Sequence, residues 1–447
     1  MDPVVIVGAG PVGVTAAILL AQRGVPCVVL ERFPQMYPLP RAVHVDDEVV
    51  RILEAAGVAE EFLKVSRPGL GLRLLDAKHR VMATFARDPG GSRHGYPQAN
   101  MFDQPDLERL LRDRLLSLPA VDFVGGATVF QVTSSSVRYR RDGEEHEVRA
   151  SAVLGCDGAN STVRGLIGAT LVDLRFAERW LVVDGVCESD LDAWGGVHQV
   201  CNRRRAATFM QLGPRRYRWE FRLLPGEVAT ELPLEPLLAP WLGDTPVTIV
   251  RRAEYTFRAN VASTWRAGRV FLLGDAAHQT PPFIGQGLGA GLRDAYNLAW
   301  KLADDLHTPD GNPTLLDTYE RERKPHVRAQ IRLAIVAGWA MTGGQVRGSI
   351  WRLPGMKTLA LRSTSPPLRG LGAGRRAGTV APVRGLDEAL GDGWSVLYLG
   401  GEPAGFGEAT LVKVTEELDP SGALRTWMRN QTFLLRPDRV VHASFPR

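Results

Sequence analysis

The sequence predicts an α/β fold with an inserted antiparallel sheet, and three observations lead to this prediction. Residues 4–7 and 27–30 are short, continuously apolar runs, which is typical of parallel strands buried on both faces. Residues 175–258 instead alternate between polar and apolar types, as an antiparallel sheet with one buried face does. Residues 270–273 return to the continuous apolar type, so we expect the chain to rejoin its first sheet after the insertion.

The N-terminal part is predicted to begin with a strand–helix–strand unit. The strand at 4–7 leads into a helix that runs to Leu20 and ends at Gly24, and the second strand ends at Glu31. Further elements are expected in this order: a helix over 46–56, strands and turns over 70–97, an amphipathic helix after Asp103-Gln104-Pro105, and strands up to 152–155.

The C-terminal part is predicted to hold two long helices and a small separate region. After the strand at 270–273, helices are expected over 289–306 and 315–340. Residues 341–377 are rich in Gly, Pro and Arg and are interpreted as a linker. The remaining residues are expected to form strands at 394–399 and 411–414, a helix at 423–429 and a hairpin turning at Pro437-Asp438.

Composition narrows the possible classes of protein. Of 447 residues, 45% are hydrophobic and 23% charged, which is ordinary globular composition. The net charge is only +5 and no basic run exceeds Arg203–Arg205, which argues against nucleic-acid binding. No apolar run approaches the roughly 18–20 residues of a membrane span, and no signal peptide is recognised. The four cysteines form no C-x-x-C and no zinc spacing, so we expect no metal site and a reducing, cytoplasmic location.

A glycine motif indicates dinucleotide binding. Gly8, Gly10 and Gly13, with Pro11 and Val12 between them, lie between a strand and a helix. Glycines there permit a tight turn and let backbone N–H groups approach a pyrophosphate at the helix N-terminus. Glu31, followed by Arg32, ends the next strand and would bind ribose hydroxyls. An acid at this position repels a 2′-phosphate, which favours FAD or NAD over NADP at this site.

Two further motifs give the chain a family resemblance. One combines Gly274-Asp275 at a strand end with a helix start that contains Pro282, Gly285, Gly287, Leu288 and Gly289. The other is Cys156-Asp157-Gly158 followed by Ser161 and Arg164. With the stretch Tyr37-Pro38-Leu39-Pro40-Arg41-Ala42-Val43-His44, these motifs resemble the single-component FAD-dependent aromatic hydroxylases. The resemblance is to the 3-(3-hydroxyphenyl)propionate hydroxylase branch, close to hydroxylases of aromatic polyketides.

The resemblance implies roles for these residues in holding FAD. Asp275 would accept hydrogen bonds from the ribityl chain, Arg41 would lie near the pyrophosphate, and Gln104 would lie on the adenosine side. Asp157 would serve both FAD and the nicotinamide cofactor. Each has a structural alternative: Asp275 as a cap for the following turn, Asp157 or Ser161 as helix caps, and Arg41 and Gln104 as structural side chains. Many relatives carry Asn where this chain has Gly289, which is a departure from the pattern.

The resemblance also places catalytic residues around the flavin edge. His44, Pro282 and Gly287 are the candidates: His44 acting on a substrate phenol, and Gly287 in a helix start whose N–H groups stabilise negative charge on the flavin. A satisfied structural histidine is the alternative for His44. Asp46, Asp47 and Glu48 are expected to complement a helix N-terminus. Trp219, Phe221 and Arg218 are proposed to face the substrate, with ordinary sheet packing as the alternative.

The implied protein is a monooxygenase of an aromatic substrate. A Rossmann-like FAD-binding domain, an inserted antiparallel-sheet substrate domain and a thioredoxin-like C-terminal region would hold tight, non-covalent FAD. NADH or NADPH would bind transiently, and O₂ would form a flavin C4a-hydroperoxide that hydroxylates a phenol. Baeyer–Villiger or epoxidation chemistry on a polyketide, and a non-catalytic FAD-binding sensor, are the alternatives. A homodimer is left open.

The expected domain boundaries follow from these assignments. The C-terminal region lacks a C-x-x-C and is therefore expected to contribute to stability or subunit contact only. The predicted boundaries are 1–70, 98–174 and 264–340 for the FAD-binding domain, 71–97 and 175–263 for the substrate domain, 341–377 for the linker, and 378–447 for the thioredoxin-like region.

Overall fold

The computed structural model describes residues 1–36, 41–191, 193–342, 366–372, 374, 376–382, 386–420 and 422–446. Most of the predicted linker and residues 37–40 of the resemblance therefore lie outside the described residues.

A six-stranded sheet forms the centre of the N-terminal part. The strand β1 (Val4–Val7) lies inside this sheet and pairs in parallel with β2 (Cys27–Glu31) on one side and β12 (Ala152–Gly155) on the other. All four residues of β1 are buried, as the continuous apolar run predicts. The order is β18 (Arg266–Ala267), β19 (Val270–Leu272), β12 (Ala152–Gly155), β1 (Val4–Val7), β2 (Cys27–Glu31) and β8 (Val121–Gly125). The strand at 270–272 rejoins this sheet in parallel with β12, which confirms the predicted return.

Helices and two small sheets surround this centre. The helices are α1 (Pro11–Ala21), α2 (Asp47–Ala55), α3 (Ala59–Val65), α4 (Gln104–Leu116) and α5 (Thr162–Leu166). The small sheets are β11 (Glu144–Arg149), β10 (Ser136–Arg141) and β9 (Thr128–Val132), and β3 (His44–Asp46), β7 (Ala99–Met101) and β4 (Arg67–Pro68).

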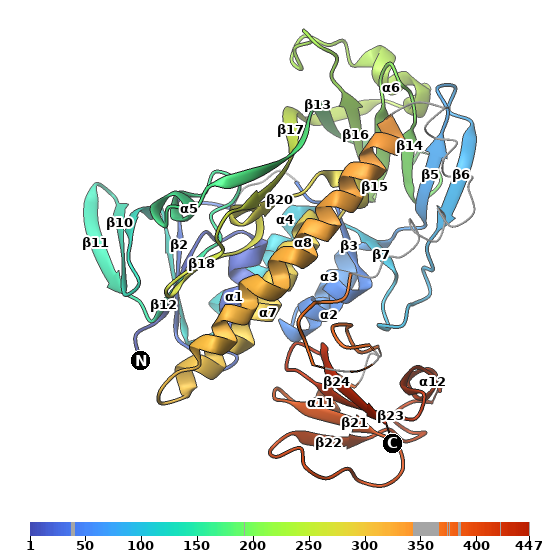
Figure 1. The fold of residues 1–447 in the computed structure, drawn as a ribbon. Helices are drawn as coiled ribbons and strands as arrows, with labels where there is room; N and C mark the ends of the chain where they lie inside the picture. The colour runs from blue at the N-terminus through green and yellow to red at the C-terminus, as the bar shows by residue number, and fades with distance from the viewer. Residues whose placement is uncertain are drawn as a thin grey trace.

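An eight-stranded sheet forms the second layer. It is built on two long antiparallel strands of 17 and 16 residues, β13 and β17, which extend away from the first sheet (Figure 1). The order is β20 (His278–Gln279), β17 (Val247–Ala262), β13 (Leu171–Cys187), β16 (Arg216–Arg222), β15 (Ala207–Gly213), β14 (Val197–Val200), β5 (Gly71–Leu75) and β6 (Val81–Ala86). The helix α6 (Glu235–Leu242) packs on the aromatic face of this sheet.

Two consecutive helices connect the layers. The buried helix α7 (Gly287–His307) packs against α1, and α8 (Pro313–Thr342) runs across the molecule to the eight-stranded sheet (Figure 1). Two short 3-10 turns, η1 (Gly274–Ala276) and η2 (Pro282–Ile284), precede α7. No helix among the described residues combines the length and the apolar character that crossing a membrane requires.

The C-terminal part forms a mixed four-stranded sheet with its own core. Its strands, in spatial order, are β22 (Thr410–Lys413), β21 (Ser395–Tyr398), β23 (Gln431–Leu435) and β24 (Val441–Pro446), with helices α11 (Asp387–Leu390) and α12 (Ala423–Met428). The strands and the helix predicted for this region are thus present, as is the hairpin around Pro437.

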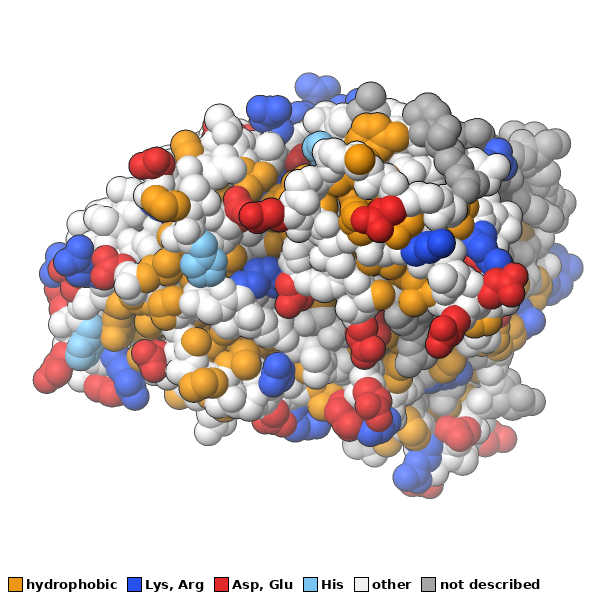
Figure 2. Space-filling view, turned by 90° about the horizontal axis from the view of Figure 1, so that it is seen from below, with side chains coloured by type: hydrophobic (Ala, Val, Ile, Leu, Met, Phe, Trp, Pro, Cys, Tyr) orange, Lys and Arg blue, Asp and Glu red, His pale blue; other side chains and the backbone are white. Residues whose placement is uncertain are grey.

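Buried ion pairs attach this region to the rest of the protein. Asp387 accepts two hydrogen bonds from the guanidinium of Arg51 on α2, at 2.8 and 3.0 Å to Nη2, and one from Arg439 at 2.8 Å. Arg436 donates to Glu322 of α8 at 2.9 Å, and Glu322 also pairs with Lys301 of α7 at 2.8 Å. The contacts at this junction are therefore mainly ion pairs and hydrogen bonds between charged side chains. On the face shown in Figure 2, acidic and basic side chains are interspersed, without a large field of one sign.

Candidate functional site

The glycine turn between β1 and α1 contains two glycines that the fold requires, Gly8 and Gly13, and one that it does not, Gly10. Gly8 has a φ of +102°, and a Cβ on it would lie 2.5 Å from the carbonyl oxygen of Cys156. A Cβ on Gly13 would lie 2.1 Å from the carbonyl oxygen of Gly8. Gly10 has ordinary backbone angles, and a Cβ there would meet nothing within 4 Å. Packing explains the first two glycines, whereas Gly10 borders open space at the start of α1, where the pyrophosphate is expected.

Glu31 lies beside this turn, as the spacing predicts. Its carboxylate accepts hydrogen bonds from the backbone N–H of Ala9 at 2.7 Å and of Phe33 at 3.0 Å. Glu31 thus orients the glycine turn, and its remaining lone pairs are available to ribose hydroxyls. Arg32 places its guanidinium 4.7 Å from the centre of the Phe33 ring.

The second glycine cluster packs on the first turn through one side chain. Val12 of α1 fills the space that a Cβ on Gly274 or Gly291 would occupy, at 3.1 and 2.6 Å from Cγ2. Asp275 follows Gly274, and its side chain is exposed. The protein atoms around its carboxyl displace water and so raise its pKa, whereas the charges of His278 and Arg41 act to lower it. An exposed carboxylate at the end of β19 fits a ligand for the hydroxyls of a ribityl chain.

The start of α7 presents unused backbone donors. The first helical hydrogen bond runs from Ala290 N–H to Gln286 C=O at 2.9 Å, and no side chain caps the helix. The N–H groups of residues 287–289 therefore precede the helical ladder. A Cβ on Gly287 would meet nothing within 4 Å. Open space at Gly10 and at Gly287, the uncapped N–H groups and the exposed carboxylate of Asp275 together fit a bound FAD.

Other predicted cofactor residues are held by the protein itself. Both oxygens of Asp157 are engaged by Ser161 and by the N–H of Val163, and Ser161 accepts from Arg164 N–H, which is the capping alternative. Gln104 is buried and accepts from the N–H of Ala42. Arg41 is exposed and lines the pocket described next, so its position agrees with a contact to the cofactor more directly than that of Gln104.

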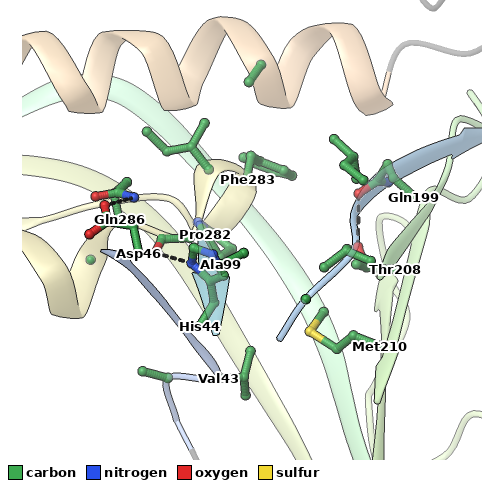
Figure 3. A pocket seen from close by; sticks show the side chains of 18 of the residues that line it. Val43, His44, Asp46, Ala99, Gln199, Thr208, Met210, Pro282, Phe283 and Gln286 are labelled. Carbon is green, nitrogen blue, oxygen red and sulfur yellow. Dashed lines mark hydrogen bonds between the residues drawn. The ribbon is translucent and has the colours of Figure 1, made fainter. Parts of the chain in front are cut away.

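A pocket of about 350 Å³ lies between the α7 turn and the eight-stranded sheet (Figure 3). Its apolar wall includes Trp180, Met210, Pro282, Phe283 and Leu288, and Ala337 of α8 also lines it. Phe283 links the layers, because its ring lies edge-on to Trp180 at 5.9 Å and against Gly338 of α8. The pocket is of the size and character of a site for a small aromatic molecule.

Three predicted catalytic residues border this pocket. His44, Pro282 and Gly287 all line it, so residues far apart in sequence converge as predicted. His44 Nδ1 lies 3.3 Å from the carbonyl oxygen of Gly285, which can only accept. Nδ1 therefore carries the proton and Nε2 keeps its lone pair. Burial lowers the pKa of His44, with the charge of Asp46 and the Gly285 hydrogen bond in opposition.

A buried charge network that the sequence did not reveal supports the α7 turn. Arg293 donates to Asp46 at 2.8 and 3.0 Å and to Glu48 at 2.8 Å, and Gln286 donates to Asp46 at 2.9 Å. Burial acts to raise the pKa of Glu48, but the charge and hydrogen bond of Arg293, together with the charges of Arg93 and Arg323, lower it overall. A Cβ on Gly289 would lie 2.9 Å from Arg293 Nη1, which explains why this chain has no asparagine there. Asp46 also caps α2 by accepting from Val49 N–H at 2.9 Å, as predicted.

The prediction that Trp219 and Phe221 face the substrate is wrong. Both are buried in the aromatic core on the other side of the sheet, whereas Arg218 and Glu220 line the pocket. Successive side chains of a strand point to opposite faces, so Arg218 and Trp219 cannot share one. Gln199 and Thr208 also line the pocket and were not predicted from the sequence. Strand alternation and cross-strand register would place both on the pocket face once one pocket residue, such as Glu220, is known.

These features define a flavin-binding type of α/β protein, in which the eight-stranded sheet forms one wall of the pocket beside the α7 turn. The chain belongs to the FAD binding domain family, whose model matches residues 1–334. It is 40% identical over 349 residues to the "Probable NADH-specific resorcinol 4-hydroxylase" of Rhodococcus jostii (strain RHA1), covering 76% of this chain and 65% of that relative. The chain thus spans just under two thirds of that relative's length.

Two further similarities extend over nearly the whole chain. It is 31% identical over 505 aligned residues to a "3-(3-hydroxy-phenyl)propionate/3-hydroxycinnamic acid hydroxylase" of Mycobacterium sp. (strain JLS), covering 98% of this chain and 88% of that one. A crystal structure of aklavinone-11 hydroxylase with FAD and aklavinone has a TM-score of 0.83 at 22% identity, covering 99% of this chain and 95% of that one, which shows a shared fold.

Proposed function

We propose that the protein is an FAD-dependent monooxygenase that hydroxylates a small phenol, with NADH or NADPH as reductant and O₂ as oxidant. The observation that carries this proposal is the apolar pocket between the uncapped start of α7 and a sheet wall, with a half-buried histidine, His44, at its edge. The names of the relatives support phenols as substrates, and the name of one of them supports NADH.

FAD, when bound, would supply the redox chemistry that couples NAD(P)H oxidation to oxygen transfer. The chain would hold its pyrophosphate at Gly10 and the start of α1, its ribityl chain at Asp275, and its ring at residues 285–289. The N–H groups at the start of α7 would stabilise negative charge on the ring. Phe283, Ala337 and Met341 would exclude water from the reacting atoms.

His44 would act as the base for the substrate phenol. Its Nδ1–H is committed to Gly285, so Nε2 is the atom that can accept the phenol proton. Removing this proton makes the ring more electron-rich and a better acceptor of electrophilic oxygen. The proposed setting is the cytoplasm, where NAD(P)H is available and the four free cysteines stay reduced.

The direct test is a screen of small phenols with the purified, FAD-loaded protein. NAD(P)H oxidation, H₂O₂ and hydroxylated product are measured on the same samples. We expect at least one phenol to stimulate NAD(P)H oxidation and to be converted to a catechol- or quinol-type product carrying one additional oxygen. A protein that binds FAD but oxidises no NAD(P)H with any phenol would contradict the proposal.

The pH dependence of turnover should report His44. Because burial lowers the pKa of His44 below its ordinary value of about 6.5, the base form persists below that pH, and the rate should fall only at lower pH values. His44→Asn keeps a group that can bond to Gly285 but removes the base, and should lower kcat by about 10²–10³. The acid limb of its pH–rate profile should also disappear. An unchanged profile in this variant would exclude His44 as the base.

A further inference from the structure

We infer that the sheet wall of the pocket selects a phenol carrying a second hydrogen-bond donor, such as another hydroxyl, and disfavours a phenol carrying a carboxylate. This inference rests on the proposed function and assigns the substrate class of the same pocket. The residues that carry it are Gln199, Thr208 and Glu220, which all line the pocket.

The three side chains form one row across adjacent strands. Gln199 of β14 lies directly opposite Thr208 of β15, and Thr208 lies directly opposite Glu220 of β16. Residues in direct register on neighbouring strands point to the same face. The row therefore presents its polar atoms together, and Figure 3 shows Gln199 and Thr208 on the sheet side of the pocket, apart from His44 and Pro282.

The protein itself uses the hydrogen-bond donors of this row. Thr208 donates its hydroxyl proton to Gln199 Oε1 at 3.0 Å. Gln199 donates from Nε2 to the carbonyl oxygens of Ala207 at 3.2 Å and of Val200 at 3.4 Å. These carbonyls can only accept, so they fix the orientation of the amide. What remains toward the pocket is acceptor capacity on Thr208 Oγ1 and Gln199 Oε1, beside the carboxyl of Glu220.

The two arginines nearest the row, Arg218 and Arg251, are balanced by the acids Asp184 and Glu220. Arg218 binds Asp184 at 2.7 and 3.1 Å, and Arg251 lies 3.7 Å from the same acid. Glu220 lies 4.0 Å from Arg218. The two arginines therefore face two acids, all in buried positions. A substrate carboxylate placed against the row would meet the carboxyl of Glu220 and the acceptor oxygens of Thr208 and Gln199.

His44 and the row on the sheet wall can therefore each accept a hydrogen bond from a donor group on the ligand. His44 Nε2 can accept from the hydroxyl that is to be activated, and the row can accept from a second hydroxyl on the same ring. Arg41 and Arg87 also line the pocket and would be the groups for a carboxylated phenol to reach. Binding of a carboxylated phenol through Arg41 or Arg87 is the specific alternative, and binding measurements distinguish it from binding at the row.

Equilibrium binding to the oxidised, FAD-loaded protein tests the inference without turnover. The probes are resorcinol, 3-methoxyphenol, which lacks the second donor, and 3-(3-hydroxyphenyl)propionate, which carries a carboxylate. Titration calorimetry or the flavin absorbance change gives the three dissociation constants. We expect resorcinol to bind about tenfold more tightly than either other probe, the effect of one buried hydrogen bond.

Variants of the row sharpen the test. Thr208→Val should reduce the preference for resorcinol over 3-methoxyphenol to about threefold or less, and Thr208→Ser should restore it. Glu220→Gln should tighten binding of the carboxylated probe by about threefold or more, because a like charge is removed. Thr248→Val, at an exposed position of β17 in the same sheet, is the matched control and should change neither ratio.

The outcomes separate this inference from the proposed function. Tighter binding of the carboxylated phenol than of resorcinol, or an unchanged preference in Thr208→Val, would overturn the inference while leaving phenol hydroxylation intact. If none of the three phenols binds, the proposed function fails and the inference fails with it.

Discussion

Replacing Gly287 with valine should leave the protein folded but slow flavin-dependent turnover by about 10²–10³. A Cβ at this position meets no protein atom within 4 Å, so the fold itself does not require glycine there. The same open space lies beside the uncapped N–H groups at the start of α7, where the flavin ring is expected. A branched side chain would displace the ring from these N–H groups. NAD(P)H oxidation, H₂O₂ and product measured together should show slow reduction and mostly H₂O₂.

The control for this variant is Gly165→Val. Gly165 lies on α5, is exposed, and a Cβ there also meets nothing within 4 Å. Both variants should keep the wild-type circular dichroism and melting temperature, but only Gly287→Val should lose coupled turnover. Normal rate and stoichiometry in a folded, FAD-loaded Gly287→Val protein would show that this turn does not hold the flavin.

Replacing Glu322 with glutamine should lower the free energy of unfolding by about 3–5 kcal/mol, because two buried cations lose their shared partner. Glu322 is 4% exposed and pairs with Lys301 at 2.8 Å and with Arg436 at 2.9 Å. Burial alone would raise the pKa of Glu322, but these charges lower it to about 2. Denaturant unfolding followed by circular dichroism measures the loss.

The acid dependence of stability provides a second measurement on the same carboxylate. The pKa of Glu322 is about 2 in the folded protein and about 4.5 when unfolded, so the unfolded chain binds more protons between these values. Wild-type stability contributed by Glu322 is therefore present above pH 4.5 and is lost as the pH falls toward 2. Glu322→Gln should lack this part of the acid loss, and Asp304→Asn, at an exposed site on α7, should keep it. Equal acid profiles for the two variants would contradict the assignment.

The sequence was sufficient for the elements whose patterns are local. The buried strands at 4–7 and 270–272 follow from apolar runs. The helices that begin at residues 11, 104 and 287 follow from glycine or proline at defined positions, although the last two begin about two residues earlier than predicted. The convergence of His44 with Pro282 and Gly287 was predicted because a family resemblance joined motifs that are distant in the chain.

The substrate side could not be read in the same way. Aromatic side chains were expected at the pocket, but strand alternation assigns Trp219 and Phe221 to a core, and the pocket to their polar neighbours. Arg293 gave no signal, because one arginine on a long helix resembles a surface residue until its partners Asp46 and Glu48 are placed beside it. Both omissions concern contacts between segments whose register the sequence does not define.

The position of Asp387 between Arg51 and Arg439 has a consequence for cooperativity. Releasing the C-terminal sheet would take Asp387 away from Arg51 of α2 and Arg436 away from Glu322 of α8, so partial opening at this junction is costly. Calorimetry should accordingly record one transition in which both parts melt together, and amide exchange in β21 and β23 should be no faster than in α2. The C-terminal region is in this respect a part of one folding unit, not an appendage that can be removed without cost.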